Sequence, residues 1–316
     1  MFKLRHIFKP ADAQQEREFE RINVENKRSR YLETNPLARY ENDLVYREKV
    51  DRIKAGIGEP HGLILDIGGN TAGEATLLKQ LGYNIIVGDI NETALDISRE
   101  RVEKFGLKAP GYVALDVHHL PFKDESFSAV TVIEALHHFV NYDQALKEIF
   151  RVLKPGGKLF SLEPNALNPL RRASEVRDRL RGTIEKSFYV HQLNALCAAA
   201  GFNEINVKSI ATGRSSWKLE EVPAYRRPIA RFHGWLAIHI PVVFGTLRLE
   251  AKKGNPTQRN SNSTSDIREL FQSPKNQGEL SYSESRRIWV EKSGTHAFPE
   301  FNGIPVLIAE DAIALK

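Results

Sequence analysis

Between residues 61 and 163 the sequence alternates regularly between apolar strand-like runs and helix-like segments, and this alternation is the strongest constraint on the fold. Runs such as NIIVGD and SAVTVI are almost continuously apolar, which is typical of parallel strands covered by helices on both faces. Parallel neighbours need a right-handed crossover, so the pattern predicts an α/β fold with an open, doubly wound, mostly parallel sheet. The expected strands are 63–67, 84–89, 111–115, 128–133 and 156–163, with two more inside 201–210 and 242–253, and the expected helices are about 72–81, 92–105, 141–153 and 189–200.

The rest of the sequence divides into regions of different composition. Residues 1–60 predict an N-terminal helical cap of two helices, interrupted by the segment TNPLARY, and residues 61–253 form the main domain. Within that domain, 164–190 breaks the alternation with prolines and many basic residues, which predicts a lid-like insertion. Residues 254–266 are polar and predict a linker, so 267–316 should form a separate small α+β domain that ends in a short helix.

The chain of 316 residues has a single cysteine, Cys197, placed on the inner face of an expected helix. One cysteine excludes a disulfide framework and a zinc site built from cysteines, and it favours a reducing, cytoplasmic setting. The basic start of the sequence lacks the apolar segment of a signal peptide, and no run of about 18 uncharged apolar residues occurs. We therefore expect neither a signal peptide nor a transmembrane helix, while peripheral contact with a membrane stays open.

Positive charge is concentrated in one part of the chain. Residues 165–260 contain 16 Lys and Arg against 7 Asp and Glu, although the net charge of the whole chain is only +5. A solvated basic face is one explanation, and a surface for an acidic or phosphorylated small-molecule substrate, acidic headgroups or nucleic acid is the other. The segment WKLEEVPAYRRPIARFHGWLAIHIP mixes aromatic, apolar and basic residues, which suits either an interfacial segment or ordinary core packing.

Three acids end three successive expected strands. Asp66 precedes a glycine-rich turn at 68–73, Asp89 ends the next strand, and Asp116 ends the third. A strand that stops at such a turn before a helix leaves backbone N–H groups facing the crevice, which suits a polar ligand. Asp66 suits a cationic ammonium group, and Asp89 can accept hydrogen bonds from both hydroxyls of a ribose. Alternatively, the turn holds no ligand and each acid caps the following helix.

Five motifs follow one another in this region, namely LDIGGN (65–70), GD (88–89), ALDVHHLPF (114–122), FSAVTVIEALHHF (127–139) and LKPGGKLFSLEPN (153–165). In their order and spacing they resemble a class I S-adenosylmethionine-dependent methyltransferase of the small-molecule group, over about residues 61–251. The resemblance implies a Rossmann-like methyltransferase sheet of seven strands with S-adenosyl-L-methionine as its cofactor.

The resemblance also implies roles for individual residues. The turn and the acid before it would hold the methionine end of the cofactor, the second acid the ribose, and the third acid with its neighbour the adenine. The residues that it assigns to the cofactor are Asp66, Gly68, Gly69, Asn70, Gly73, Asp89, Ile90, Asp116, Val117 and Glu134.

A base is needed only if the methyl acceptor must lose a proton. His137 and His138 would face the incoming nucleophile, and His137 is the first candidate for this base. The alternative is that His137 shapes the pocket while the nucleophile loses its proton elsewhere. His191 and Glu163 are further candidates.

The glycine-rich turn departs from the family's usual pattern, which has glycine at three alternating positions. Those positions hold Gly68, Asn70 and Ala72 here, with Gly73 one place later. Because asparagine tolerates a positive φ and alanine is small, we expect the loop to form with a slightly changed shape. Cofactor affinity is the property that this change affects.

Residues 270–312 resemble a small zinc-ribbon-like domain that activates several transfer-RNA and translation-factor methyltransferases; Pro274, Gly278 and Pro305 are among the residues that fit its frame. The positions where zinc-binding members carry cysteine hold Ser273, Asn276, Glu291 and Gly294, so we expect no metal in this domain. Without thiolates to bind a metal, the domain must depend on its own core or on docking to the catalytic domain, and we expect it to dock.

The sequence therefore predicts methyl transfer from S-adenosyl-L-methionine to an O or N atom of a small-molecule or lipid-like metabolite. One alternative is a transfer-RNA or translation-protein substrate, although EALHH lacks the Asn/Asp-Pro-Pro-aromatic signature of enzymes that methylate exocyclic amines of adenine or side-chain amides. Two alternatives from other classes are an NAD-dependent oxidoreductase, which Asp66 and the segment 134–138 disfavour, and an inactive scaffold, which has no need of the three acids.

Overall fold

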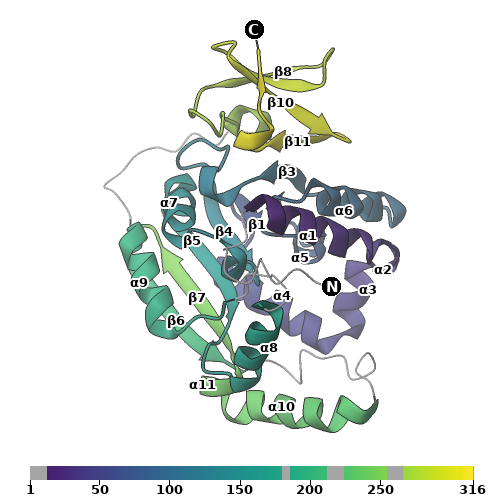
Figure 1. Ribbon diagram of the computed structural model, residues 1–316, viewed down its shortest axis with the longest axis vertical. Helices are drawn as coiled ribbons and strands as arrows, with labels where there is room; N and C mark the ends of the chain where they lie inside the picture. The colour runs from purple at the N-terminus through teal and green to yellow at the C-terminus, as the bar shows by residue number, and fades with distance from the viewer. Residues whose placement is uncertain (1–12, 180–185, 212–223, 255–265, 316) are drawn as a thin grey trace, which may run out of the picture.

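The computed structural model describes residues 13–179, 186–211, 224–254 and 266–315, and seven strands form the larger part of its 12-stranded sheet (Figure 1). The strand order is β6-β7-β5-β4-β1-β2-β3, and only β7 runs antiparallel to its neighbours. The predicted doubly wound, mostly parallel α/β fold is confirmed. The strands are β1 (Leu63–Ile67), β2 (Asn84–Asp89), β3 (Gly111–Leu115), β4 (Phe127–Ile133), β5 (Leu153–Pro164), β6 (Glu204–Ile210) and β7 (Thr246–Lys252).

Helices cover both faces of this sheet, and each face has its own apolar core. Val50, Leu77 and Phe160 belong to one core, while Phe127 and Cys197 belong to the other. Burial on both faces explains why the strands are almost continuously apolar in sequence. The helices are α4 (Leu44–Ile57), α5 (Gly73–Gln80) and α6 (Glu92–Lys104) on the first face, and α7 (Tyr142–Val152) and α9 (Val190–Ala200) on the second.

The N-terminal region contains four helices where the sequence predicted two. These are α1 (Ala13–Glu25), α2 (Arg28–Glu33), α3 (Pro36–Asn42) and α4. The prediction was wrong because the side chains of Asn35 and Asp43 each accept hydrogen bonds from two backbone N–H groups and start a new helix within a few residues of the previous one. Helices α1 and α2 lie against α6, and α3 lies against α5.

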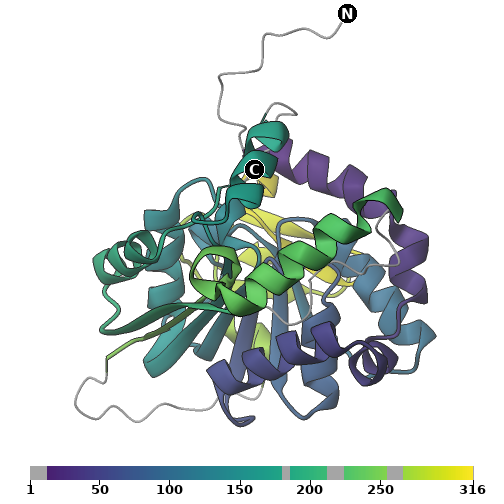
Figure 2. The ribbon, with the colours of Figure 1, turned by 90° about the horizontal axis from the view of Figure 1, so that it is seen from below.

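The segments that follow β5 and β6 carry three more helices, α8 (Pro169–Arg179), α10 (Arg227–His239) and α11 (Pro241–Phe244). Seen from below in Figure 2, α10 runs across the near face of the molecule. Within the described parts of the chain, no helix is long and apolar enough to cross a bilayer. Residues 180–185 of the predicted lid and 255–265 of the predicted linker lie outside the described residues.

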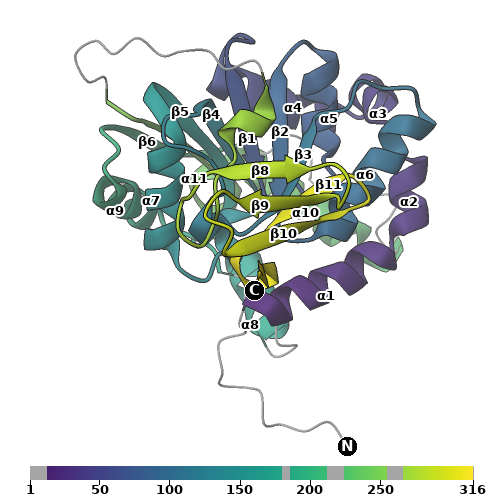
Figure 3. The same ribbon diagram turned by 90° about the horizontal axis from the view of Figure 1, so that it is seen from above.

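The C-terminal region is built of short strands joined to the main sheet. Strand β11 pairs in parallel with β3, through Val306 with Ala114 and Leu307 with Leu115, so the small domain continues the methyltransferase-like sheet at its β3 edge (Figures 1 and 3). The chain ends in a 3-10 turn (Ala309–Asp311) and a two-residue strand, so the predicted terminal helix was wrong. The added strands are β8 (Leu280–Ser283), β9 (Ile288–Glu291), β10 (His296–Phe301), β11 (Ile304–Leu307) and β12 (Ile313–Ala314).

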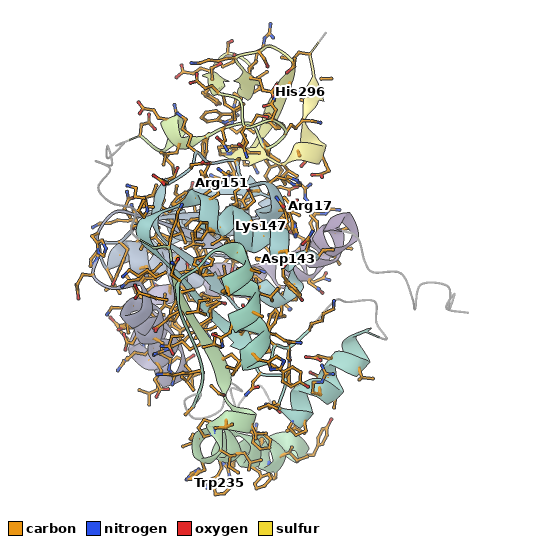
Figure 4. The ribbon with its side chains drawn as sticks, turned by 90° about the vertical axis from the view of Figure 1, so that its left-hand side faces the viewer. Arg17, Asp143, Lys147, Arg151, Trp235 and His296 are labelled. Atoms are coloured by element: carbon orange, nitrogen blue, oxygen red, sulfur yellow. The ribbon has the colours of Figure 1, made fainter. Side chains whose placement is uncertain are left out.

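Aromatic and ionic contacts join the small domain to the rest of the protein. The ring of Phe271 lies 5.6 Å from that of Phe122 and 5.0 Å from that of Trp289, and all three belong to one core. On the surface, Arg17 of α1 pairs with Glu92 of α6 at 2.8 Å and with Asp311 at 2.9 Å; Figure 4 shows Arg17 on α1, below the C-terminal strands. The small domain therefore shares its core with the catalytic domain.

A buried carboxylate organises the interior of the small domain. Glu291 accepts hydrogen bonds from Ser273 at 2.5 Å and from Ser293 at 3.1 Å, and its other neighbours are Thr295 and His296. Burial raises the pKa of Glu291, but these hydrogen bonds outweigh it and lower the pKa to about 2. Ser273 and Glu291 occupy two positions where the resemblance places zinc-binding cysteines, and the described residues contain no cluster suited to a metal ion.

We predict that Glu291→Gln lowers the free energy of unfolding at pH 7 by about 2 kcal/mol, because charged hydrogen bonds are lost. The folded-state pKa is depressed, so the contribution of Glu291 is present above pH 4.5 and is lost as the pH falls to about 2. Urea unfolding at pH 7 and pH 3 should show a smaller difference between wild type and variant at pH 3. Glu279→Gln, at an exposed pair with Lys292, is the control; an equal effect of both variants would contradict the prediction.

Candidate functional site

The carboxyl ends of β1, β2, β3 and β4 meet at a cavity of about 340 Å³. Side chains from successive strand ends converge there because parallel strands all end at the same edge of a sheet. Of the residues predicted to bind the cofactor, the cavity is lined by Asp66, Gly68, Gly69, Asn70, Asp89, Ile90, Asp116, Val117 and Glu134. Gly73 is absent from this lining and instead borders a second cavity.

The glycine-rich turn passes close to the neighbouring strands. A Cβ atom on Gly68 would lie 2.4 Å from the Cβ atom of Ala135, and one on Gly69 would lie 2.5 Å from Val87 Cγ1, so larger residues do not fit. Asn70 and Ala72, which replace the family's usual glycines, both have positive φ values of 48° and 52°. The loop therefore keeps its left-handed turns with non-glycine residues, at a cost of roughly 1–2 kcal/mol for the alanine.

Asp89 connects the glycine-rich turn to the start of α6. Its Oδ2 atom accepts a hydrogen bond from the Asn70 N–H at 2.7 Å, and its Oδ1 atom accepts one from the Asn91 N–H at 2.9 Å. Each carboxylate oxygen has a second lone pair, so both oxygens can also accept from a diol. The position suits a ribose, as predicted, and Asp89 additionally fixes the shape of the turn.

Asp66 is buried beneath the turn. Thr131 donates a hydrogen bond to its Oδ1 atom at 2.6 Å. Burial raises the pKa of Asp66 to about 7, against the lowering effect of Thr131, and the negative charges of Glu74 and Asp89 act in the same direction as burial. A cation placed beside Asp66 would stabilise its ionised form.

Lys49 is a cavity residue that sequence reasoning missed. It comes from α4, and its Nζ atom lies 3.0 Å from Glu74 and 2.9 Å from Glu134. Burial lowers the pKa of Lys49, but the two carboxylates outweigh it and raise the pKa above the ordinary value. With Asp66 on one side and Lys49 on the other, this end of the cavity suits a group that carries both an ammonium and a carboxylate.

Asp116 lies at the start of a 3-10 turn (Val117–His119) and accepts from the backbone N–H of His118 at 3.0 Å. The Nδ1 atom of His118 also lies 2.6 Å from Asp116, and its Nε2 atom accepts from the N–H of Asn141 at 3.2 Å. Burial raises the pKa of Asp116, but the hydrogen bonds from His118 outweigh it and lower the pKa. The helix-capping alternative is thus realised at Asp116, although the residue also lines the cavity.

The three predicted catalytic histidines lie at different positions relative to the cavity. His138 lines the cavity, whereas His137 is buried outside that lining, with Nδ1 2.8 Å from Glu163 Oε2. Glu163 also accepts from the N–H of Leu136 at 3.0 Å and from Ser161 at 2.9 Å, so it fixes the 3-10 turn (Leu136–His138). We therefore infer that His137 and Glu163 position this turn, while the role of His137 as the base stays a prediction.

His191 also lies away from the cavity. It is an exposed residue of α9 whose ring stacks on Tyr189, with centroids 5.5 Å apart. The sequence could not show this because His191 follows an insertion whose path is set by tertiary contacts. The structure gives no support to a catalytic role for His191.

Comparison with known proteins agrees with this geometry. Residues 65–161 match the family model described as a methyltransferase domain. That segment is therefore similar to methyltransferase domains. The match includes the glycine-rich turn, the three acids and the two adjacent histidines.

The chain is similar to two curated relatives over part of its length. The ubiquinone/menaquinone biosynthesis C-methyltransferase UbiE of Bartonella henselae is 39% identical over 109 residues, which are 33% of this chain and 41% of the relative. A demethylmenaquinone methyltransferase of Clavibacter sepedonicus is 33% identical over 135 residues, 43% of this chain and 54% of the relative. The chain thus spans about half the length of these relatives or less.

Among solved structures, the fold is similar to a chain in the complex of the Haloferax volcanii Trm112 methyltransferase activator with a methyltransferase. The TM-score is 0.57 with 16% sequence identity, and the match covers 76% of this chain and 99% of that chain. At this identity the likeness supports the fold alone.

We predict that His137→Ala lowers the free energy of unfolding by about 3 kcal/mol, because it removes a buried partner of the Glu163 carboxylate. His138→Ala, at the neighbouring half-buried position, should change it by less than about 1 kcal/mol. Urea denaturation of both variants checks this difference. Equal destabilisation by the two changes would contradict the positioning role of His137.

Asp66 predicts a pH dependence of cofactor binding. Only the ionised form of Asp66 pairs with an ammonium group, and burial raises the pKa of Asp66 to about 7. The affinity for S-adenosylhomocysteine should therefore fall by up to about tenfold per pH unit below pH 7. Calorimetric titrations from pH 8 to pH 5.5 measure this slope.

Two variants test whether the ionisation of Asp66 causes this dependence of the affinity on pH. Asp66→Asn should bind more weakly at pH 8 and lose the dependence on pH, whereas Asp124→Asn, at an exposed ion pair with Arg151, should keep it. A slope that survives in Asp66→Asn would assign it to another group.

Proposed function

We propose that the protein transfers a methyl group from S-adenosyl-L-methionine to an O or N atom of a small, lipid-like metabolite. The observation that carries this proposal is the meeting of Asp66, Asp89 and Asp116 at one cavity of a methyltransferase domain. When bound, S-adenosyl-L-methionine supplies an electrophilic methyl group on its sulfonium.

Different residues of the chain are suited to bind different parts of the cofactor. Asp66 and Lys49 flank the end of the cavity that suits the amino-acid part of the cofactor, with the backbone of the glycine-rich turn beside them. Asp89 offers two acceptor atoms for the ribose hydroxyls, and Ile90 lies next to it to cover the base. The main catalytic contribution expected from such a site is alignment of donor and acceptor.

His138 is the candidate for proton removal from the acceptor. It lines the cavity beside Phe139 and Glu134, while the turn beneath it is fixed by Glu163. As the new bond to the methyl group forms and the carbon–sulfur bond breaks, the acceptor must lose a proton, which the His138 imidazole can accept. The sulfonium becomes a neutral thioether in the same step.

A lipid-like acceptor is favoured by the apolar surface of α10. Ile229, Phe232 and Trp235 are between 51% and 61% exposed, and Trp235 lies at the lower edge of the molecule in Figure 4. Helix α10 also carries the exposed Arg227 and Arg231. A helix with exposed aromatic and basic residues suits peripheral contact with a membrane that has acidic headgroups.

Carbon is a second candidate for the acceptor atom, because the relative from Bartonella henselae is a ubiquinone/menaquinone biosynthesis C-methyltransferase. A base at His138 would serve this chemistry as well. Removing the proton of a ring hydroxyl makes the neighbouring ring carbon nucleophilic.

The test is transfer of a labelled methyl group from S-adenosyl-L-methionine to candidate acceptors. We expect label in a reduced 1,4-naphthoquinone without a ring methyl group, or in an apolar lipid extract, and mass spectrometry with NMR distinguishes O-, N- and C-methyl products. Bulk transfer RNA and ribosomal protein are tested as acceptors in parallel reactions. Label in RNA or protein but in no small molecule would overturn the proposal.

His138→Gln tests the proposed base. We expect kcat to fall by about 10²–10³-fold with KM nearly unchanged, because the proton acceptor is lost while binding is kept. Lys147→Gln, a change in the neighbouring helix α7 away from the cavity lining, is the control and should keep full activity. An unchanged kcat in His138→Gln would remove His138 from the reaction.

A further inference from the structure

A second cavity of about 350 Å³ lies between the N-terminal helices, the glycine-rich turn and α6. It shares Gly69, Asn70 and Glu74 with the first cavity. Its lining is strongly basic, because it contains one carboxylate and four cationic side chains, those of Lys27, Arg30, Arg39 and Arg101. The carboxylate, Glu74, is already paired with Lys49 at 3.0 Å.

Arg101 is the most unusual residue of this lining. It is only 2% exposed, and its Nη2 atom donates to the backbone oxygen of Thr71 at 2.5 Å. Among the described residues, no hydrogen-bond acceptor faces its Nε atom and no carboxylate pairs with it. Burial lowers the pKa of Arg101 and the nearby negative charge of Glu74 only partly offsets this effect, so an anion beside the guanidinium would stabilise it.

Tyr46 adds a second unused donor to the same wall. Its side chain is 2% exposed, and its hydroxyl has no hydrogen-bond partner in the described part of the chain. The guanidinium of Arg39 lies over the Tyr46 ring, 4.1 Å from the centroid. Tyr46 of α4 and Arg101 of α6 thus border one cavity, and among the described residues neither the Tyr46 hydroxyl nor the Arg101 Nε atom has a hydrogen-bond acceptor.

We propose that this second cavity binds the phosphate group of a phosphorylated small molecule, at a site separate from the cofactor. Phosphate offers several acceptor oxygens and up to two negative charges, which match the Arg101 and Tyr46 donors. The amino-acid end of the cofactor has its own cation, Lys49, and Lys49 does not line the second cavity. The cavity volume leaves room for more than the phosphate itself.

Inorganic pyrophosphate is the probe for this site. Calorimetry should show binding to the wild-type protein at low ionic strength, and Arg101→Met and Arg39→Gln should each weaken it by at least about tenfold. Arg99→Gln is the matched control, because Arg99 lies on the same helix but pairs with Asp96 and Glu103; it should bind as wild type does.

Thermal unfolding without ligand gives an independent readout. Arg101→Met removes an unpaired buried charge, so we expect an unchanged or higher Tm; a purely structural arginine would give a lower Tm on substitution. A lower Tm for Arg101→Met combined with unchanged pyrophosphate binding by Arg39→Gln would overturn the proposal.

A last titration separates this site from the cofactor site. Pyrophosphate should still bind when the protein is saturated with S-adenosylhomocysteine, with an affinity within about threefold of that of the free protein. Loss of pyrophosphate binding under saturation would assign the cavity to the methionine end of the cofactor and overturn the proposal. If methyl transfer failed with every acceptor tested, the outcome of this pyrophosphate titration would still stand.

Discussion

The carboxylate of Asp89 holds together the part of the fold on which the site depends. By accepting from the N–H groups of Asn70 and Asn91, it connects the glycine-rich turn after β1 to the start of α6 after β2. The turn needs this support because Asn70 and Ala72 hold left-handed conformations, which glycine adopts more readily. Asp89 thus serves the backbone and the expected ribose at once, and removing it would disturb both.

Residues that follow a strand directly could be predicted from the sequence. The alternation of strands and helices alone predicts the positions of Asp66 and Asp89, because Asp66 is the next-to-last residue of β1 and Asp89 is the last residue of β2 in the same parallel sheet. Lys49 and Arg101 could not be predicted, since their positions depend on how helices pack across the sheet. Which of the two histidines, His137 or His138, lines the cavity depends on Glu163. This residue is distant in sequence and reaches the turn only in the folded protein.

Strand pairing and packing join the small C-terminal domain to the rest of the protein. Strand β11 adds to the β3 edge, which leaves that edge covered, and Phe271 places an aromatic ring in the core of the catalytic domain. Inside the domain, Ser273 and Glu291 form a buried hydrogen bond at positions where the resemblance places cysteines.

We expect the cavity at the strand ends to bind S-adenosyl-L-methionine through Asp89. Calorimetric titration of the full chain with S-adenosylhomocysteine and with NAD, in the wild type and in Asp89→Asn, tests it most directly. We predict one S-adenosylhomocysteine per chain, no measurable binding of NAD, and a loss of about 30-fold or more in the variant. Tight binding of NAD, or equal affinity of wild type and Asp89→Asn for S-adenosylhomocysteine, would contradict the account.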